Sequence, residues 1–311
     1  MKHHIDPKID CVFKAILGAE ENRNLVVHFL NAILGSELSA PIDTVDILNP
    51  YNDKEFLADK LSIVDVKARD RKGHLYQVEI QLLNYHHLPA RILYTWADIY
   101  SQQLQSGENY GQLNPTYAIW LLAENVIKDD CEYLHAFKFR DNHGKTLIEH
   151  GGVWLLELLK FKAPHIETEQ QRWLKFFTDG EQLDDVLLPE WMTTLEMRQA
   201  MGTLRQFSEK ERDYHAYQAR QNFLREQHSI MQEREMLLQE RETMSQELET
   251  MSQERETMSQ ELETMSQERE IMSQDQQILE HKLELESQAR QEALAEVERL
   301  KKLLEQNNMS Q

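Results

Sequence analysis

Two carboxylates and an amide interrupt an otherwise apolar, strand-like stretch. The segment IVDVKARDRKGHLYQVEIQ, residues 63–81, carries Asp65, Glu79 and Gln81 where Val, Ile or Leu would pack better. Two carboxylates a few ångströms apart can bind a hard divalent cation through oxygen and leave positions for a phosphate oxygen and a nucleophilic water. These residue types therefore fit hydrolysis of a phosphodiester, with the amide positioning the water or the phosphate.

A β-hairpin would bring these three residues together. The sequence on both sides of the turn signal DRKG alternates with the period of a strand. A three-residue loop over 71–73, with Gly73 in a left-handed conformation, sets Asp65 directly opposite Glu79. Their Cβ atoms are then ~5 Å apart, and Gln81 follows on the same face.

The same spacing also fits the solvated face of a half-buried hairpin, whose Asp, Glu and Gln side chains simply meet water. Spacing alone favours this second interpretation, because polar alternation is typical of any amphipathic sheet. The chemical interpretation therefore needs support from the rest of the chain.

Helices and further strands surround the hairpin. Apolar residues at helical spacing predict two amphipathic helices within residues 5–35 and a third from His86 to Tyr110, ended by Gly107. The run TYAIWLLAEN predicts a strand covered on both faces, and two later segments predict a hairpin and a strand near the sheet edge. We therefore expect an α/β core, with strands surrounded by helices, that ends near Pro164.

The composition of the chain indicates three parts. We expect the α/β core over residues 1–165, a helical extension over 166–225 and a heptad-repeat arm over 226–311. All seven Pro lie at or before Pro189 and the last Gly is Gly202, so the arm contains no helix breaker. One long helix is the expected structure of the arm.

The arm alternates the heptads ETMSQEL and ETMSQER, which predicts a coiled coil and a homo-oligomer formed through it. Arg at half of the a positions and flexible Met at d predict a seam weaker than that of an Ile/Leu zipper. A solvated, charged helix that grew by duplication of a short coding unit fits the pattern equally well. In this register, a is Arg241, Leu248, Arg255, Leu262 and Arg269, and d is Met244, Met251, Met258, Met265 and Met272.

The net charge of −20 is concentrated in the arm. From Glu226 onward there are 21 acidic and 9 basic residues, which leaves 33 acidic and 25 basic residues before it and a net charge of about −8 there. This balance argues against tight, sequence-indifferent binding to phosphate backbones. It remains compatible with an enzyme that meets phosphate through a metal and a local basic patch.

The cysteine content and the apolar segments indicate the cellular compartment. Cys11 and Cys131 are the only cysteines, so neither a disulfide framework nor a CxxC metal site is available. The amino terminus lacks the apolar stretch of a signal peptide, and the longest apolar run, YAIWLLA, is far too short to span a membrane. We expect a cytoplasmic protein without a membrane segment.

Three segments in order resemble a known family. IDPKIDCVFKAILG, DKLSIVDVKARDRKGHLYQVEIQ and ARILYTWADIYSQQLQSGENYGQLNPTYAIWLL are similar to the Rpn family of recombination-promoting nucleases and putative transposases. That family is a branch of the PD-(D/E)XK nuclease superfamily. The similarity covers roughly residues 4–225 and leaves the heptad arm outside.

The resemblance implies a restriction-endonuclease-like core, a mixed sheet flanked by helices, that cuts DNA with Mg²⁺, with Mn²⁺ as a second possible metal. Asp65 matches the metal-binding Asp of the superfamily, and Glu79 matches the acidic residue of its second motif. Gln81 stands where most of the superfamily has a Lys that stabilises negative charge. A neutral Gln can hydrogen-bond but does not supply that charge.

Several residues are candidates to complete the site. Lys14, Lys60 and Lys67 could each supply positive charge, and Asp10 could add a helix-borne carboxylate, as the superfamily does. Each of them also fits an ordinary solvated position.

Basic residues near the hairpin are candidates for DNA contact. Arg91 and Tyr94 lie three residues apart on the following helix and therefore on the same side. Arg91 and Tyr94 could meet the DNA backbone or support Glu79 and Gln81 from behind. For Tyr94 the favoured expectation is a core position with its hydroxyl at the surface. The basic residues at the hairpin tip, candidates for phosphate contact, are Lys67, Arg69, Arg71 and Lys72.

The expected function is metal-dependent DNA cleavage by an endonuclease. Its setting in recombination or transposon-like DNA processing follows from the resemblance alone. The alternative is a nuclease-derived protein that no longer cuts and acts as a DNA-binding or interaction module, held in an assembly by its coiled coil.

Overall fold

The computed structural model describes residues 2–49, 65–184 and 187–308. Within them, a six-stranded mixed sheet has the order β1-β2-β3-β4-β6-β5. β3, β4 and β6 are parallel, and the remaining neighbours are antiparallel. The strands are β1 (Val45–Ile47), β2 (Val66–Asp70), β3 (Leu75–Gln81), β4 (Thr116–Leu122), β5 (Leu134–Phe137) and β6 (Gly151–Glu157).

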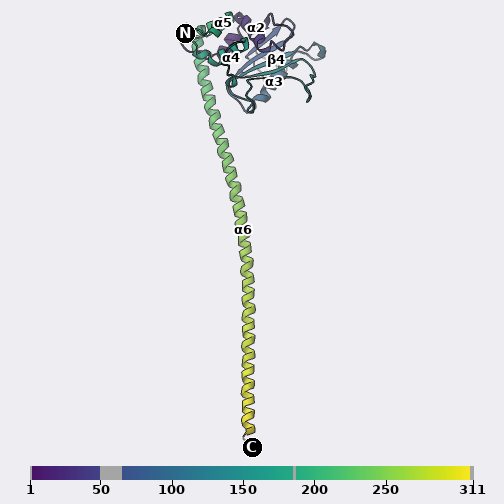
Figure 1. Ribbon diagram of the computed structural model, residues 1–311, viewed down its shortest axis with the longest axis vertical. Coiled ribbons are helices and arrows are strands. Elements are labelled where there is room, and N and C mark those ends of the chain that lie inside the picture. The colour runs from purple at the N-terminus through teal and green to yellow at the C-terminus, as the bar shows by residue number, and fades with distance from the viewer. Residues whose placement is uncertain (1, 50–64, 185–186, 309–311) are drawn as a thin grey trace. The chain divides into compact units, whose positions relative to one another are not determined.

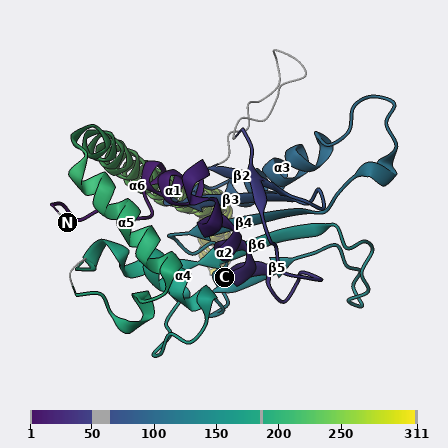
Figure 2. The same ribbon diagram turned by 90° about the horizontal axis from the view of Figure 1, so that it is seen from above.

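Helices cover both faces of this sheet, as Figure 2 shows. The α-helices are α1 (Asp10–Leu17), α2 (Arg23–Leu34), α3 (Leu88–Ser101), α4 (Glu169–Asp179), α5 (Leu195–Glu209) and α6 (Glu211–Asn308). Short 3₁₀ turns are η1 (Glu20–Asn22), η2 (Tyr110–Gln112), η3 (Leu158–Lys160), η4 (Gly180–Gln182) and η5 (Glu190–Met192). None of the helices in the described part of the chain is long and apolar enough to cross a bilayer.

Alternation along the central strands divides the core into two layers. Ile119 and Leu121 of β4 point to the face covered by α1, α2, α4 and α5, whereas Ala118 and Trp120 point to the face covered by α3. Both sets are buried, so β4 has the continuous apolar sequence expected of a strand that is covered on both faces. The prediction of a mixed sheet flanked by helices is confirmed.

The hairpin of β2 and β3 has the predicted register. Val66 pairs with Val78, which sets Asp65 opposite Glu79. Gly73 has φ +87°, the left-handed conformation that the three-residue loop requires. The position of the two carboxylates therefore follows from strand period and turn chemistry alone.

The helix after the hairpin is shorter than predicted. α3 ends at Ser101, so the prediction that Gly107 ends it is wrong. The Gln103 side chain donates to the Asn114 backbone carbonyl oxygen (3.0 Å) and accepts from the Asn114 backbone nitrogen (2.9 Å), which fixes the segment after the helix against the entry to β4. With its side chain bonded to Asn114, Gln103 lies outside the helix, four residues before Gly107.

The chain divides into two compact units, Met1–Ser229 and Ile230–Gln311. In the first unit, α4 and α5 contribute to the same hydrophobic cluster as α1 and α2, through residues such as Trp173 and Leu204. The first turns of α6 belong to this unit, where the buried Tyr217 accepts a hydrogen bond from the Asp6 backbone nitrogen at its hydroxyl (3.1 Å).

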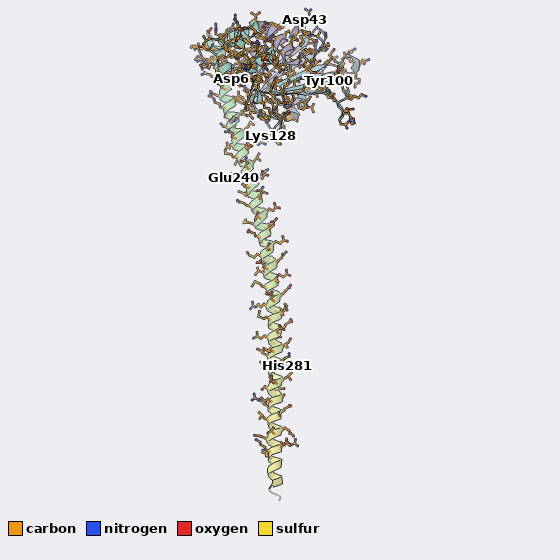
Figure 3. The ribbon with its side chains drawn as sticks, in the orientation of Figure 1. Asp6, Asp43, Tyr100, Lys128, Glu240 and His281 are labelled. Carbon is orange, nitrogen blue, oxygen red and sulfur yellow. The ribbon has the colours of Figure 1, made fainter. Side chains whose placement is uncertain are left out.

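The second unit is part of the single continuous helix α6 drawn in Figure 1. Every side chain described from Gln232 to Lys302 is exposed, and Figure 3 shows side chains such as His281 projecting from the helix into open space. The Met side chains at the d positions are 56% to 68% exposed. The long helix is confirmed, while its pairing into a coiled coil stays a prediction.

Candidate active site

The centre of the site is a pair of carboxylates at the base of the β2–β3 hairpin. The Asp65 backbone nitrogen donates to Glu79 Oε1 (3.2 Å), and the Ile80 backbone nitrogen donates to Asp65 Oδ2 (3.0 Å). Each carboxylate thus bonds to the backbone of the opposite strand. The cross-strand register holds the two acids next to each other in fixed orientations.

Burial and mutual repulsion make this pair hard to ionise. Glu79 is 3% exposed, and its burial together with the neighbouring Asp65 charge raises its pKa to about 8. The pKa of Asp65 is also raised, mainly by burial, against the opposing effects of the Ile80 N–H and Lys14. If both acids were ionised, the site would therefore carry more negative charge than the surrounding groups neutralise.

α1 brings a cation and a further acid to this pair. Lys14 Nζ lies 3.2 Å from Asp65 Oδ1. Asp10 lies one helical turn earlier, and its charge contributes to the raised pKa of Asp65. Asp10 Oδ1 accepts from Arg220 Nε of α6 (2.9 Å), so it is already partnered by a cation. The candidate Lys60 lies outside the described residues.

α3 orients the amide that follows Glu79. Arg91 Nη1 donates to Gln81 Oε1 (3.0 Å), and Gln81 Nε2 donates to the Leu83 carbonyl oxygen (2.7 Å). The Arg91 guanidinium lies 5.7 Å from the centre of the Trp120 ring and helps to lower the pKa of Glu79. Of its two predicted roles, Arg91 is placed to support Gln81 and Glu79 from the side of α3.

The expectation that Tyr94 lies in the core is wrong. Its side chain is 47% exposed, while Leu88, Ile92 and Trp96 form the buried stripe of α3. Because Tyr94 follows Ile92 by two residues, it falls off this stripe and faces solvent.

Gln77 is a site residue that the sequence reasoning missed. It is fully buried, and its Nε2 donates to Glu79 Oε1 (3.2 Å), which favours the charged form of Glu79. The signal was present, because Gln77, Glu79 and Gln81 alternate on one strand and must share a face. A buried polar side chain next to a candidate catalytic acid is a natural positioning group.

The predicted basic residues lie along β2 and at its tip. Lys67 is half-buried, whereas Arg69, Arg71 and Lys72 are exposed. The loop starts six residues after Asp65, which is about 20 Å along an extended strand. The structure thus places Arg71 and Lys72 at the other end of the hairpin from the carboxylate pair.

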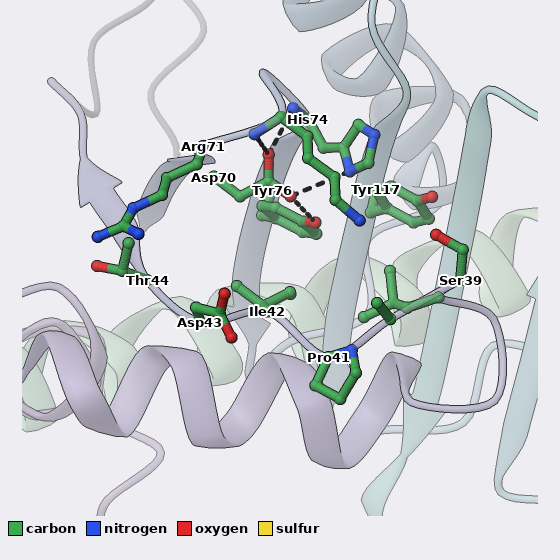
Figure 4. Close-up of a pocket in the computed structure, with 13 residues that line it drawn as sticks. Ser39, Pro41, Ile42, Asp43, Thr44, Asp70, Arg71, His74, Tyr76 and Tyr117 are labelled. Carbon is green, nitrogen blue, oxygen red and sulfur yellow. Dashed lines mark hydrogen bonds and ion pairs between the residues drawn. The ribbon is translucent and has the colours of Figure 1, made fainter.

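The hairpin tip has its own polar cluster, shown in Figure 4. Asp70 Oδ2 accepts from the Tyr76 hydroxyl (2.9 Å) and lies 3.0 Å from His74 Nδ1. Asp70 Oδ1 accepts from the backbone nitrogens of Lys72 and His74, both at 2.9 Å. Through these bonds Asp70 stabilises the turn of the hairpin. The adjacent cavity holds only about 70 Å³.

The donor set fits a hard divalent cation. No cluster of three or more His, Cys, Asp and Glu side chains suited to a metal occurs within the described residues. Asp65 and Glu79 provide two carboxylates, and Mg²⁺ characteristically uses one or two carboxylates together with waters and substrate phosphate oxygens. A cation would also neutralise the repulsion that raises both pKa values.

Comparison with known proteins places the chain in a family. The family model described as PD-(D/E)XK nuclease family transposase matches residues 7–234. Searches of curated proteins and of solved structures gave no match. The matched range includes the carboxylate pair, α1, α3 and the first turns of α6. The chain therefore belongs to the PD-(D/E)XK nuclease family of transposases.

Proposed function

We propose that this protein is a metal-dependent DNA endonuclease that hydrolyses phosphodiester bonds. The observation that carries the proposal is the pair of the half-buried Asp65 and the buried Glu79, which lie opposite each other across the hairpin and have raised pKa values. Two adjacent acids withdrawn from water destabilise the fold unless a positive charge neutralises them, and a cation site for phosphate chemistry uses such a pair. Family membership supports the same reaction class.

Asp65 and Glu79 would hold Mg²⁺ or Mn²⁺, with Gln77 orienting the Glu79 carboxylate. When bound, such an ion neutralises charge at the phosphate and makes an attacking water more acidic. Lys14 beside Asp65 supplies a positive charge where the phosphate would gain negative charge, the task usually given to the Lys that Gln81 replaces. Gln81, held by Arg91, hydrogen-bonds the water or the phosphate.

The remaining polar residues have supporting roles in this proposal. Asp10 adds negative potential from α1 and is itself balanced by Arg220. Lys60 stays a candidate for further positive charge, and the basic residues of β2 and the tip stay candidates for contact with DNA. The family description supports a role in recombination or transposon-like DNA processing, and we propose a cytoplasmic location for it.

Metal binding separates this function from that of a non-cutting interaction module. We expect Mg²⁺ or Mn²⁺ at millimolar concentration to raise the melting temperature of the wild-type protein by about 2–4 °C. This shift corresponds to an increase of ~1 kcal/mol in the free energy of unfolding when the ion binds the folded protein. The shift should disappear in Asp65→Ala and persist in Asp141→Ala, a control in the exposed turn after β5. Equal shifts in all three proteins would mean adventitious binding and would favour the interaction module.

We also propose that the heptad arm joins copies of the chain while the core, with its helical extension, folds alone. The buried side chains of the core all lie between Ile5 and Tyr217. A truncation after Ser229 should therefore stay folded and become smaller than the full-length assembly by more than the mass of the missing arm. Light scattering after size-exclusion chromatography measures this. Aggregation, or an unchanged number of copies, contradicts the proposal.

A further inference from the structure

An open depression lies between the first turns of α6 and the end of β3. It has a volume of about 400 Å³ and belongs entirely to the unit Met1–Ser229. The residues that line it are Ile9, Leu82, Gln221, Leu224, Arg225, His228 and Ser229.

Two residues that line the depression are sequence neighbours of candidate active-site residues. Ile9 directly precedes Asp10, and Leu82 directly follows Gln81. The ion pair of Asp10 with Arg220 joins α1 to α6 beside it. A strand of DNA with one phosphate at the carboxylate pair would therefore have neighbouring phosphates within reach of this surface.

The chemistry of the lining suits a phosphate backbone. Arg225 and His228 are exposed and provide N–H donors, and none of the lining residues in the described part of the chain carries a carboxylate. Ile9, Leu82 and Leu224 supply an apolar floor that can contact the sugars. Arg225 Nη1 has a long contact of 3.4 Å with Asn222 Oδ1, so a ligand could readily replace this weak bond.

The charge of this depression differs from the net charge of the protein. The first 225 residues are net acidic, so attraction to DNA has to come from a restricted cationic area. The spacing of Arg225 and His228, three residues apart on α6, puts both side chains on one side of the helix. They can bind consecutive phosphates without reading sequence.

We propose that this depression binds the phosphate backbone of the DNA substrate next to the cleaved bond, with Arg225 and His228 as the contacting residues. The inference rests on the proposed function, because it assumes that DNA reaches the carboxylate pair. In this proposal the first turns of α6 do more than connect the core to the arm. They position the DNA substrate relative to the carboxylate pair.

The test measures DNA binding separately from DNA cutting. Full-length protein is titrated into a fluorescent 20-base-pair duplex in EDTA, over a series of salt concentrations. We expect Arg225→Gln to weaken binding about tenfold at low salt and to reduce the slope of log K against log salt by about 1, as loss of one phosphate contact predicts. His228→Gln should have a smaller effect in the same direction.

Arg234→Gln is the matched control, because it removes the same charge from α6 about 13 Å further along the helix. The two variants are compared at ~0.15 M salt, where this distance exceeds the screening length of about 8 Å. We expect it to change affinity by less than about twofold. Circular dichroism checks that the variants stay helical. Wild-type affinity and salt slope in Arg225→Gln, or equal losses in Arg225→Gln and Arg234→Gln, overturn the proposal.

This experiment also distinguishes the inference from the proposed function. If wild type binds the duplex through Arg225 but never cuts in Mg²⁺, the binding surface stands and the nuclease function fails. If wild type cuts and Arg225→Gln binds normally, the nuclease function stands and the binding surface fails.

Discussion

Replacing Glu79 by Gln is expected to stabilise the metal-free protein at pH 8.5 by on the order of 4 kcal/mol. The folded-state pKa of Glu79, about 8, is raised above its ordinary value of 4.5 by burial and by Asp65. A raised pKa contributes stability that is fully present below the unfolded value and is lost as pH rises through the folded value. The free energy of unfolding of wild type should therefore fall between about pH 4.5 and pH 8 relative to the variant.

Urea unfolding in EDTA at several values of pH from 5 to 8.5 measures this difference. Glu79→Gln keeps an oxygen that can accept from the Asp65 backbone nitrogen, so the fold is retained. Glu132→Gln, at an exposed position after β4, is the control and should stay within about 0.5 kcal/mol of wild type. Parallel pH profiles for wild type and Glu79→Gln would mean that Glu79 ionises as easily as a surface carboxylate.

Replacing Lys14 by Met is expected to lower the rate of DNA cutting by about 10²–10³-fold, the usual effect of removing one group that stabilises charge in the transition state. Lys14 pairs with Asp65 at 3.2 Å and has a side chain 40% exposed. Met can replace the aliphatic stem without straining α1, so stability should change little.

Single-turnover cleavage of a labelled duplex in Mg²⁺ measures the effect. Lys162→Met removes a charge from an exposed position after β6 and should cut at the wild-type rate. Lys14→Arg should recover part of the rate, because it restores the charge with a different shape. A rate within about twofold of wild type in Lys14→Met would assign the charge to another residue, with Lys60 the next to test.

The features that the sequence predicted are those fixed by local rules. Strand period and a left-handed Gly73 determine the hairpin register, so Asp65 opposite Glu79 could be predicted before any tertiary structure was known. The apolar run of β4 likewise showed a strand covered on both faces. In these cases one local conformation satisfies the pattern.

The features that escaped prediction depend on contacts distant in sequence. Asp10 meets Arg220 across 210 residues of chain, and no pattern in either segment indicates the other. Lys14 could not be chosen among the candidate lysines, because the choice depends on how α1 packs beside the hairpin. The insertion of β6 between β4 and β5 is also a matter of topology rather than of strand period.

The central claim is that Asp65 and Glu79 form a metal-dependent nuclease site. Conversion of supercoiled plasmid to nicked or linear DNA tests it most directly, using wild type, Asp65→Ala and Glu79→Ala, each in Mg²⁺ and in EDTA. We predict cutting by wild type in Mg²⁺ alone, with both variants at least about 10³-fold slower. An intact plasmid with wild type in Mg²⁺, or equal cutting by the variants, would contradict the claim and favour a binding module.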